Sequence, residues 1–366
     1  MPQSLEVTPP QSFRSSPPTP PPTIKKTSHA VARVIADIKS RQTGRSGLSE
    51  AWITYPLDVD QYAELLEQVH GDACLSGYVI QKLRHHYIPF AKRLVFQMPT
   101  QLHEWIISTV VEEVSRQLQV LGTRHDASAA FARAVVARGS PTLDFTEAGY
   151  GRHDPDAQFR HLDAQYPGVV MEVSYSQKQK DMPYIAEDYI LGSDGDIRRV
   201  ICLDIGYSHS KKATLSAWEP SVVTNEAGEP ELIAQQIIVD MIIRDEQGNP
   251  GSDEEAGLLL QLRDFATETL VGSEPLTDRI RIPASELCSY LTQAEETMAL
   301  LKQKQGAVRE TKPWVRKRRR QKTPPEELDN NREVQFRKIE EKAIAKAEKD
   351  DSSYKTTSDE ETSRCE

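Results

Sequence analysis

Residues 152–189 read RHDPDAQFRHLDAQYPGVVMEVSYSQKQKDMPYIAEDY, and this stretch decides the fold of the chain. It holds two short apolar segments, 157–161 and 169–173, with Asp156 just before the first and Glu172 inside the second. An acid within so apolar a run is costly to bury unless it is paired or holds a metal ion. Two acids on adjacent strands lie side by side in a sheet, which is how a divalent-cation site for phosphodiester chemistry is built. The stretch therefore predicts such a site.

Composition limits the class of protein. The chain has 366 residues, enough for one large domain or two small ones with tails, and a net charge of −10. Because the chain as a whole is acidic, any contact with nucleic acid has to be local. Its four cysteines form no CxxC pair, so we expect an intracellular setting and no structural zinc. The amino-terminal residues do not resemble a secretion signal and no apolar run is long enough to span a bilayer, so we expect no membrane partner.

Shifts in composition divide the chain into parts. The two ends are rich in Pro, Ser, Thr or charge and have little to bury, so we expect them to be disordered. The predicted parts are a Pro-rich tail at 1–28, an α/β domain at 29–305 with its core at about 90–220, a basic linker at 306–324, a charged helix at 325–350 and a disordered tail at 351–366.

Hydrophobic periodicity within the domain predicts both helices and strands. Apolar residues at helical spacing predict helices at 29–41, 58–69, 100–121, 180–191 and 283–304. Shorter apolar or alternating runs predict strands. The first starts at 78–80 and continues to 94–98, and the others lie at 131–137, 142–145, 157–161, 169–173, 199–205, 213–218 and 232–243. Residues 258–265 are predicted as a strand or a short helix. Thr100 is the expected N-cap of the third helix. A strand–strand–helix–strand order after a helix predicts a mixed α/β sheet.

A set of short motifs occurs along this domain in a fixed order. These are Met98-Pro99 at the end of a strand, His103-Glu104 on the next helix, Pro155-Asp156, Glu172-Val173-Ser174-Tyr175-Ser176 and Tyr189. In this order they resemble the PD-(D/E)XK nuclease superfamily, and within it the bacterial Uma-type endonucleases and their fungal relatives. The resemblance covers roughly residues 90–220.

The resemblance implies a restriction-endonuclease-like fold, which is a mixed sheet of about four core strands flanked by helices. Asp156 and Glu172 would match the metal-binding acids, with the Val173 carbonyl as a third oxygen ligand. Mg²⁺ or Mn²⁺ is the implied ion, since hard cations suit oxygen ligands, phosphate and water. Such an ion would acidify a bound water and neutralise charge on the phosphate. Glu104, on the preceding helix, is an auxiliary candidate.

The chain departs from the family pattern at the catalytic lysine. The superfamily carries a lysine two residues after the second acid, where this chain has Ser174. The Uma-type pattern moves that lysine to the following helix, four residues before its tyrosine. Counting back from Tyr189 gives Ile185, which carries no charge. Ser174 stays an auxiliary candidate as a neutral hydroxyl.

Two nearby lysines are candidates for the missing role. Lys178 continues the period-two parity of Glu172 and would share its face if the strand extended that far. Lys180 is the second candidate, and Gln177 is a weaker, uncharged substitute. A simpler alternative also stays open at this point: Asp156 would cap a strand, and Glu172 would be hydrogen-bonded without any metal.

A dense basic run lies outside the domain, at Arg316, Lys317, Arg318, Arg319 and Arg320. It fits a nuclear import signal read by a carrier, and it also fits sequence-independent binding of phosphates. A run within a Pro-flanked linker is easily reached by a carrier, so we favour import and a nuclear over a cytoplasmic location. A solvated charge run without function is the simpler alternative.

Histidines offer a weaker metal signal. His85 and His86 are adjacent, but neighbouring strand residues face opposite ways, so we expect a hydrogen-bonded or exposed pair rather than metal ligands. His209 has no nucleophile motif such as GxSxG around it.

Three functions therefore follow from the sequence. The first is a divalent-metal-dependent nuclease acting on DNA or RNA. The second is a catalytically inactive nuclease-fold protein that binds nucleic acid or protein. The third is a scaffold whose tails carry its interactions. The acids retained at 156 and 172 favour the first, whereas Ser174 and Ile185 favour the second.

Overall fold

The structure is a computed structural model that describes residues 27–43, 52–175, 179–206, 210–272 and 276–303, together with Lys338 and Lys342. By the proximity of Cα atoms the chain divides into two units, Met1–Gly306 and Ala307–Glu366. The predicted basic linker and the tail at 351–366 lie outside the described residues, as do all but Thr27 and Ser28 of the tail at 1–28 and all but two residues of the helix predicted at 325–350. Ser28 caps α1 (His29–Gln42), since its side chain accepts from the Val31 N–H.

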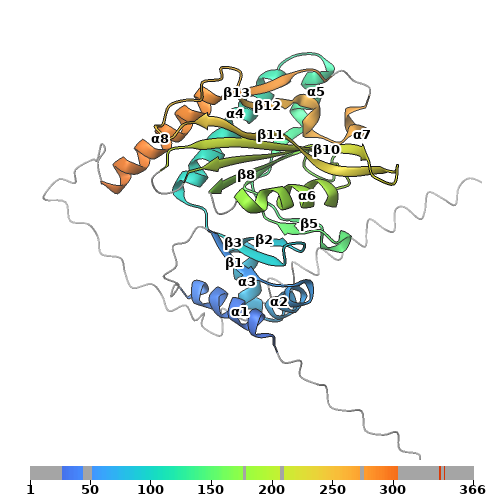
Figure 1. Ribbon diagram of the computed structural model, residues 1–366, viewed down its shortest axis with the longest axis vertical. Helices are drawn as coiled ribbons and strands as arrows, with labels where there is room; N and C mark the ends of the chain where they lie inside the picture. The colour runs from blue at the N-terminus through green and yellow to red at the C-terminus, as the bar shows by residue number, and fades with distance from the viewer. Residues whose placement is uncertain are drawn as a thin grey trace, which may run out of the picture. The chain divides into compact units, whose positions relative to one another are not determined.

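A six-stranded sheet forms the centre of the unit (Figure 1). Its strands, in spatial order, are β11 (Pro230–Arg244), β10 (Ala213–Thr224), β9 (Arg199–Ile205), β8 (Val169–Tyr175), β7 (Ala157–His161) and β4 (Val135–Ala137). β8 and β9 are parallel and the other neighbours are antiparallel. The parallel pair is joined by α6 (Met182–Gly192), because parallel strands need a crossover connection. The predicted mixed α/β sheet is confirmed.

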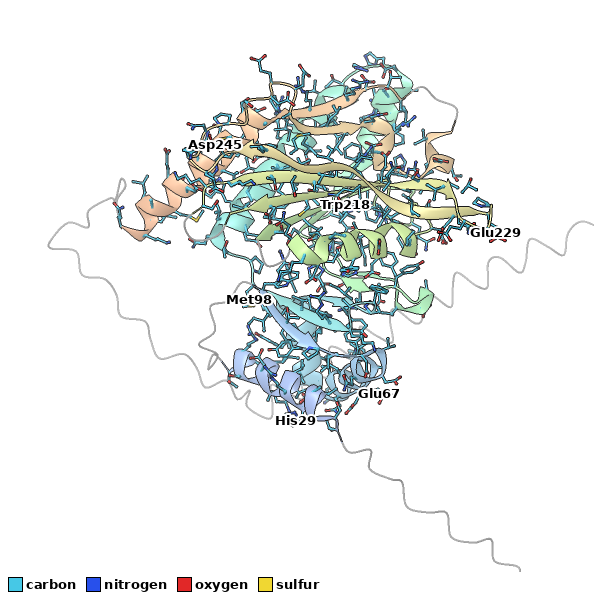
Figure 2. All side chains as sticks on the ribbon, in the orientation of Figure 1. His29, Glu67, Met98, Trp218, Glu229 and Asp245 are labelled. Carbon is cyan, nitrogen blue, oxygen red and sulfur yellow. The ribbon has the colours of Figure 1, made fainter. Side chains whose placement is uncertain are left out.

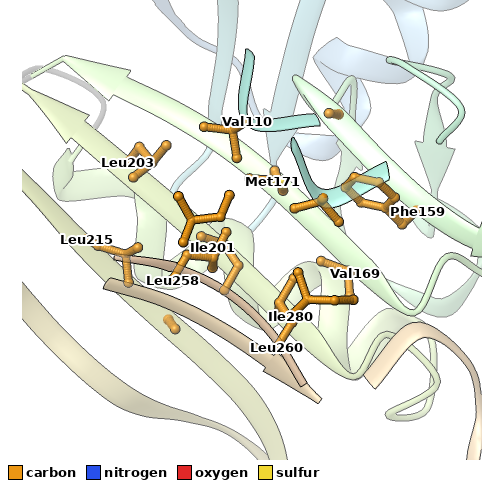
Figure 3. Close-up of a cluster of buried hydrophobic side chains, with 14 of the residues drawn as sticks. Val110, Phe159, Val169, Met171, Ile201, Leu203, Leu215, Leu258, Leu260 and Ile280 are labelled. Atoms are coloured by element: carbon orange, nitrogen blue, oxygen red, sulfur yellow. The ribbon is translucent and has the colours of Figure 1, made fainter. Parts of the chain in front are cut away.

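One face of this sheet is covered by α4 (Gln101–Gly122), α8 (Ala284–Lys302) and a small sheet of β12 (Gly257–Gln261) and β13 (Arg279–Pro283). Side chains in alternate positions of the strands point into this layer, as the period of two requires. Figure 3 shows them packed together, with strand residues against helix α4 and the small sheet; the labelled residues are Val110, Phe159, Val169, Met171, Ile201, Leu203, Leu215, Leu258, Leu260 and Ile280.

The opposite face is covered by α6. Val170 and Cys202 of the sheet pack with Ile185 and Tyr189 of the helix in a second buried cluster. This cluster also includes Val95 from a second sheet, which brings that sheet against the same face. Ile185 is completely buried, so this residue belongs to the core.

The second sheet is antiparallel and was not expected from the sequence. Its order is β1 (Trp52–Pro56), β3 (Arg93–Gln97), β2 (Arg84–Ile88), β6 (Arg152–His153) and β5 (Leu143–Asp144). Helices α1 (His29–Gln42), α2 (Val59–Gly71) and α3 (Ala73–Lys82) pack with it around a third buried cluster. Three connections run between the two sheets: from β3 to β4 through α4 and α5, from β4 to β5, and from β6 to β7.

Two predicted strands are wrong in part. Residues 78–80 lie in α3, where the Asp72 side chain accepts from the Leu75 N–H at 3.1 Å and caps the helix. Residues 131–134 lie in α5 (Ala127–Ala134), capped in the same way by Asp126. In both segments a cap and tertiary packing override the strand propensity of the apolar residues.

The helix predicted after Thr100 is confirmed. The Thr100 side chain accepts from the His103 N–H at 3.2 Å, so α4 begins where β3 has just ended. Figure 2 labels Met98 at this junction. The first turn of α4 therefore carries His103 and Glu104 next to the end of β3. Among the described residues, α7 (Glu268–Val271) is a further short helix, and no helix is both long and apolar enough to cross a membrane.

Candidate functional site

Asp156 and Glu172 lie on neighbouring strands of the large sheet. β7 is antiparallel to β8 with Ala157 paired to Met171, so the next step along both strands brings Asp156 opposite Glu172. Ala157 and Met171 point into the α4 layer, so by alternation the two acids point to the α6 face. The structure therefore brings the two acids of the sequence prediction together on one face.

The Asp156 carboxylate is buried and surrounded by donors. Its Oδ2 atom accepts from the backbone N–H of Val173 at 2.7 Å, and its Oδ1 atom accepts from Nε2 of Gln97 at 2.8 Å. Nε2 of His103 lies 3.0 Å from Oδ2. Nη1 of Arg84 lies 3.5 Å from Oδ1. These partners explain how an acid can be fully buried here, since a buried charge needs pairing and hydrogen bonds.

Arg84 also forms the rim of the site. Its Nη1 atom lies 3.2 Å from Oε1 of Glu104, and the side chains of Arg84 and Glu104 are 29 % and 50 % exposed. Glu104, the auxiliary candidate, is thus placed beside the acid pair and linked to Asp156 through Arg84. The sequence offered no signal for Arg84, which is 72 residues away from Asp156 along the chain.

Glu172 is held by α6. Its side chain is buried, and the hydroxyl of Tyr189 donates to its Oε1 atom at 2.7 Å. Burial, followed by the charge of Glu172, raises the pKa of Tyr189 well above its ordinary value, so this hydroxyl keeps its proton and remains a donor. The motif tyrosine therefore orients the second acid.

A buried chain of polar side chains runs from α6 to Asp156. Oδ2 of Asp188 lies 2.9 Å from Nε2 of His153, and the Nδ1 atoms of His153 and His86 lie 3.2 Å apart. Nε2 of His86 lies 2.9 Å from Oε1 of Gln97, whose amide nitrogen donates to Asp156. The chain fixes the Gln97 amide, because its oxygen faces the histidine and its nitrogen faces the acid. Sequence reasoning missed this network.

The histidine pair is hydrogen-bonded, as predicted. His86 belongs to the polar chain, whereas the backbone N–H of His85 donates to Oδ2 of Asp154 at 2.9 Å. Burial opposes ionisation of Asp154, but the hydrogen bond and charge of His85 outweigh it and lower the pKa of that acid below its usual range. The two rings have different partners.

Neither Ser174 nor Lys180 contacts the acid pair through its side chain in the described part of the chain. Ser174 is buried and its hydroxyl donates to Oδ1 of Asp204 on β9. Lys180 is exposed in the turn Gln179–Asp181, and within the described ranges it pairs with neither acid. Lys178, Gln177 and the basic run at 316–320 lie outside the described residues, so their roles stay predictions.

The donor set fits a hard cation. Two carboxylates and a backbone carbonyl are oxygen ligands of the kind that Mg²⁺ and Mn²⁺ take. The N–H and C=O of a strand residue point to the same neighbour, so the Val173 carbonyl is directed to the side of Asp156. Asp156 already accepts from several donors, so an ion would displace Arg84 or His103. No cluster of three or more His, Cys, Asp or Glu ligands exists in the described part of the chain, so water and the carbonyl would complete the coordination.

Comparison of the chain with protein-family models, curated proteins and solved structures finds no match. The assignment of a function therefore depends on the geometry of the side chains around Asp156 and Glu172.

Proposed function

We propose that this protein has a restriction-endonuclease-like core and hydrolyses phosphodiester bonds of nucleic acid with the help of Mg²⁺ or Mn²⁺. Asp156, Glu172 and the Val173 carbonyl are the proposed ligands. The observation that carries the proposal is the placement of the two acids on one face of adjacent strands, tied by the Val173 N–H at 2.7 Å from Asp156.

The architecture around the acids supports this proposal. The resemblance of the motifs leads us to expect a mixed sheet of about four core strands flanked by helices. The acids stand on β7 and β8, β8 runs parallel to β9 through α6, and α4 and α6 pack on opposite faces. Three motif residues lie at this site: His103 is 3.0 Å from Asp156, Tyr189 donates to Glu172, and Glu104 is linked to Asp156 through Arg84.

Each neighbour has a chemical role in the proposal. A bound divalent ion supplies a more acidic water and a positive charge for the phosphate. Gln97 and His103 orient Asp156, and Tyr189 orients Glu172. Lys178 or Lys180 is the proposed replacement for the missing lysine.

A second candidate is a catalytically inactive descendant of the nuclease fold that binds nucleic acid or protein. Specific observations favour it. Both carboxylates are shielded from solvent. Ser174 stands where the superfamily usually has its lysine, and its hydroxyl is already hydrogen-bonded to Asp204. An enzyme would have to open this site to admit an ion and a phosphate.

Cleavage of labelled oligonucleotides separates the two candidates. The full chain is incubated with single- and double-stranded DNA and RNA in Mg²⁺, Mn²⁺ or a chelator. We expect metal-dependent cleavage that Glu172→Gln abolishes. The control is Glu113→Gln, a substitution of the same kind on α4 at a residue bonded to Arg116 and Gln117. Absence of cleavage on every substrate would favour the inactive candidate.

A further inference from the structure

Two cavities flank the connection from β4 to β5. One, of about 320 Å³, is lined by Arg138, Gln158 and Arg160 among others. The other, of about 310 Å³, is lined by residues of α3, β2 and β6. Each takes part of its lining from the same short connection, residue 141 in the first cavity and residues 140 and 142 in the second. The two cavities are therefore neighbours.

These cavities concentrate positive charge in an acidic protein. The first contains two arginines and no acid. The second contains Lys82, Arg84 and Arg152 and a single acid, Asp154. That acid is engaged by the N–H of His85 and by the hydroxyl of Thr142, at 2.9 and 2.6 Å. Basic side chains outnumber acids in the lining of both cavities, although the whole chain carries −10. Arg84 and Arg152 are also paired, with Glu104 at 3.2 Å and Asp144 at 3.4 Å, so Lys82, Arg138 and Arg160 supply the positive charge without an acidic partner among the described residues.

Several of these groups are open to a ligand. Lys82 and Arg138 are exposed, and neither forms an ion pair with a described residue. The hydroxyl of Ser140, which lines the second cavity, is buried without a hydrogen-bond partner in the described part of the chain. A cation with a nearby hydroxyl donor is what a phosphate oxygen requires.

A third cavity differs from these two because its basic side chains are matched by acids. It measures about 760 Å³ and is lined by three arginines and three acids. Arg199 pairs with Glu219 at 2.7 Å and with Asp264 at 3.2 Å, and Arg198 pairs with Glu268 at 2.9 Å. Because its charges neutralise one another, this larger cavity offers little attraction to an anion.

Both basic cavities adjoin Asp156. Arg84 lines the second cavity and contacts Asp156. Gln158 lines the first cavity and follows Asp156 by two residues on β7. We infer that Lys82, Arg84, Arg138, Arg152 and Arg160, hereafter the basic surface, bind the sugar–phosphate backbone of nucleic acid and carry it across the acid pair. This rests on the proposed function, for which it names the substrate-binding surface.

The test is binding of a fluorescent oligonucleotide to the full chain, measured by anisotropy in a chelator so that no cleavage occurs. The test variant is Lys82→Gln, Arg138→Gln and Arg160→Gln combined, which leaves Arg84 and Asp156 intact. The matched control is Arg263→Gln, Arg279→Gln and Lys302→Gln, which removes the same charge from exposed residues outside the basic surface. Both triple variants are also made with residues 316–320 changed to glutamine, so that the basic run does not mask the result.

The affinity of a protein for nucleic acid falls with rising salt concentration, and it falls more steeply when more phosphates are contacted. Each contact to a single strand contributes a salt-dependence slope of about −0.7, or roughly fivefold in affinity at 0.1 M salt. We therefore expect the test variant to lose roughly a hundredfold in affinity and about two units of slope, and the control to change little. Equal loss in both variants, no loss in the test variant, or equal competition by polyglutamate of matched charge would overturn the assignment.

Failure of this inference differs from failure of the proposed function. Metal binding by the test variant is measured by calorimetry in parallel and is expected to equal that of the wild type. Oligonucleotide binding by the basic surface without any metal binding would keep the inference and reject the hydrolase. Metal binding without oligonucleotide binding would reject the inference and leave the metal site standing.

Discussion

The backbone N–H of Val173 and the Oδ2 atom of Asp156 are 2.7 Å apart, and this bond joins β8 to the residue that leads into β7. The bond lies just beyond the last backbone pair of the two strands, Ala157 with Met171. Here the acceptor is a side-chain carboxylate and not a backbone carbonyl. Asp156 therefore has a structural role in addition to the proposed role as a ligand. Substitutions at this residue affect folding as well as function.

Asp156→Asn is expected to lower the free energy of unfolding by about 1–3 kcal/mol in the absence of metal. The asparagine amide nitrogen is a donor, and in either orientation it would face another donor, the N–H of Val173 or the amide nitrogen of Gln97. Urea denaturation measures the effect. An increase in stability would mean that the Asp156 carboxylate destabilises the metal-free protein. That result would contradict a stabilising role for its hydrogen bonds with Val173 and Gln97.

Tyr189→Phe is expected to destabilise the protein by about 1–3 kcal/mol, because Glu172 loses a buried donor. The control is Tyr166→Phe, since Tyr166 packs in the same cluster and its hydroxyl has no hydrogen bond to a described residue. Thermal denaturation of both variants with and without Mn²⁺ gives the comparison. Equal effects of the two substitutions would argue against a specific role for the Tyr189 hydroxyl.

Gln97→Met is expected to weaken binding of the divalent ion by about 10–100-fold without abolishing it. Methionine keeps the length of the side chain but removes both the donor to Asp156 and the acceptor for His86. Calorimetry measures the affinity, and Gln117→Met on α4 is the control. Unchanged affinity would show that the buried polar chain does not orient Asp156.

Asp154, which is buried, and Asp204, which is half-buried, are expected to show opposite dependence on pH. Burial would raise the pKa of Asp154, but the interactions with His85 and the hydrogen bond from Thr142 together outweigh it and lower this pKa. Asp154 therefore binds fewer protons in the folded than in the unfolded state, so its stabilisation is present above the ordinary carboxyl range and is lost as pH falls. Asp154→Asn should destabilise the protein at neutral pH and have little effect in acid.

Asp204 is expected to have the opposite effect on stability as pH changes. Burial, with a further contribution from Asp240, raises its pKa. The unfolded state then loses its proton first as pH rises above about 3.9, so the folded state is destabilised progressively with rising pH. Asp204→Asn should stabilise the protein at neutral pH while keeping an acceptor for Ser174. Unfolding curves collected across the pH range test both acids, and similar profiles for the two substitutions would contradict this account.

The strands that carry the acids could be predicted because their signals are local. Glu172 stands out within an apolar run, and alternation fixes its face once the strand is recognised. Thr100 predicts the start of α4, because threonine is a favoured N-cap residue and its side chain caps this helix. These features depend on residues within a few positions of one another.

The surroundings of the site could not be predicted because they depend on distant pairings. His86 meets His153 across 67 residues, and His153 meets Asp188 across 35. The sheet that brings them together contains the two-residue strand β6, which is too short to show a period in its sequence. Arg84 reaches Asp156 only once this sheet has formed.

The most direct measurement is a calorimetric titration of the full chain with Mn²⁺ and Mg²⁺ in the absence of nucleic acid, comparing the wild type with Asp156→Asn, Glu172→Gln and the control Glu113→Gln. We expect the wild type and the control to bind one site, and each acid variant to lose it while remaining folded by circular dichroism. Binding that survives both acid substitutions, or no binding by the wild type even when an oligonucleotide is added, would contradict the metal centre at Asp156 and Glu172.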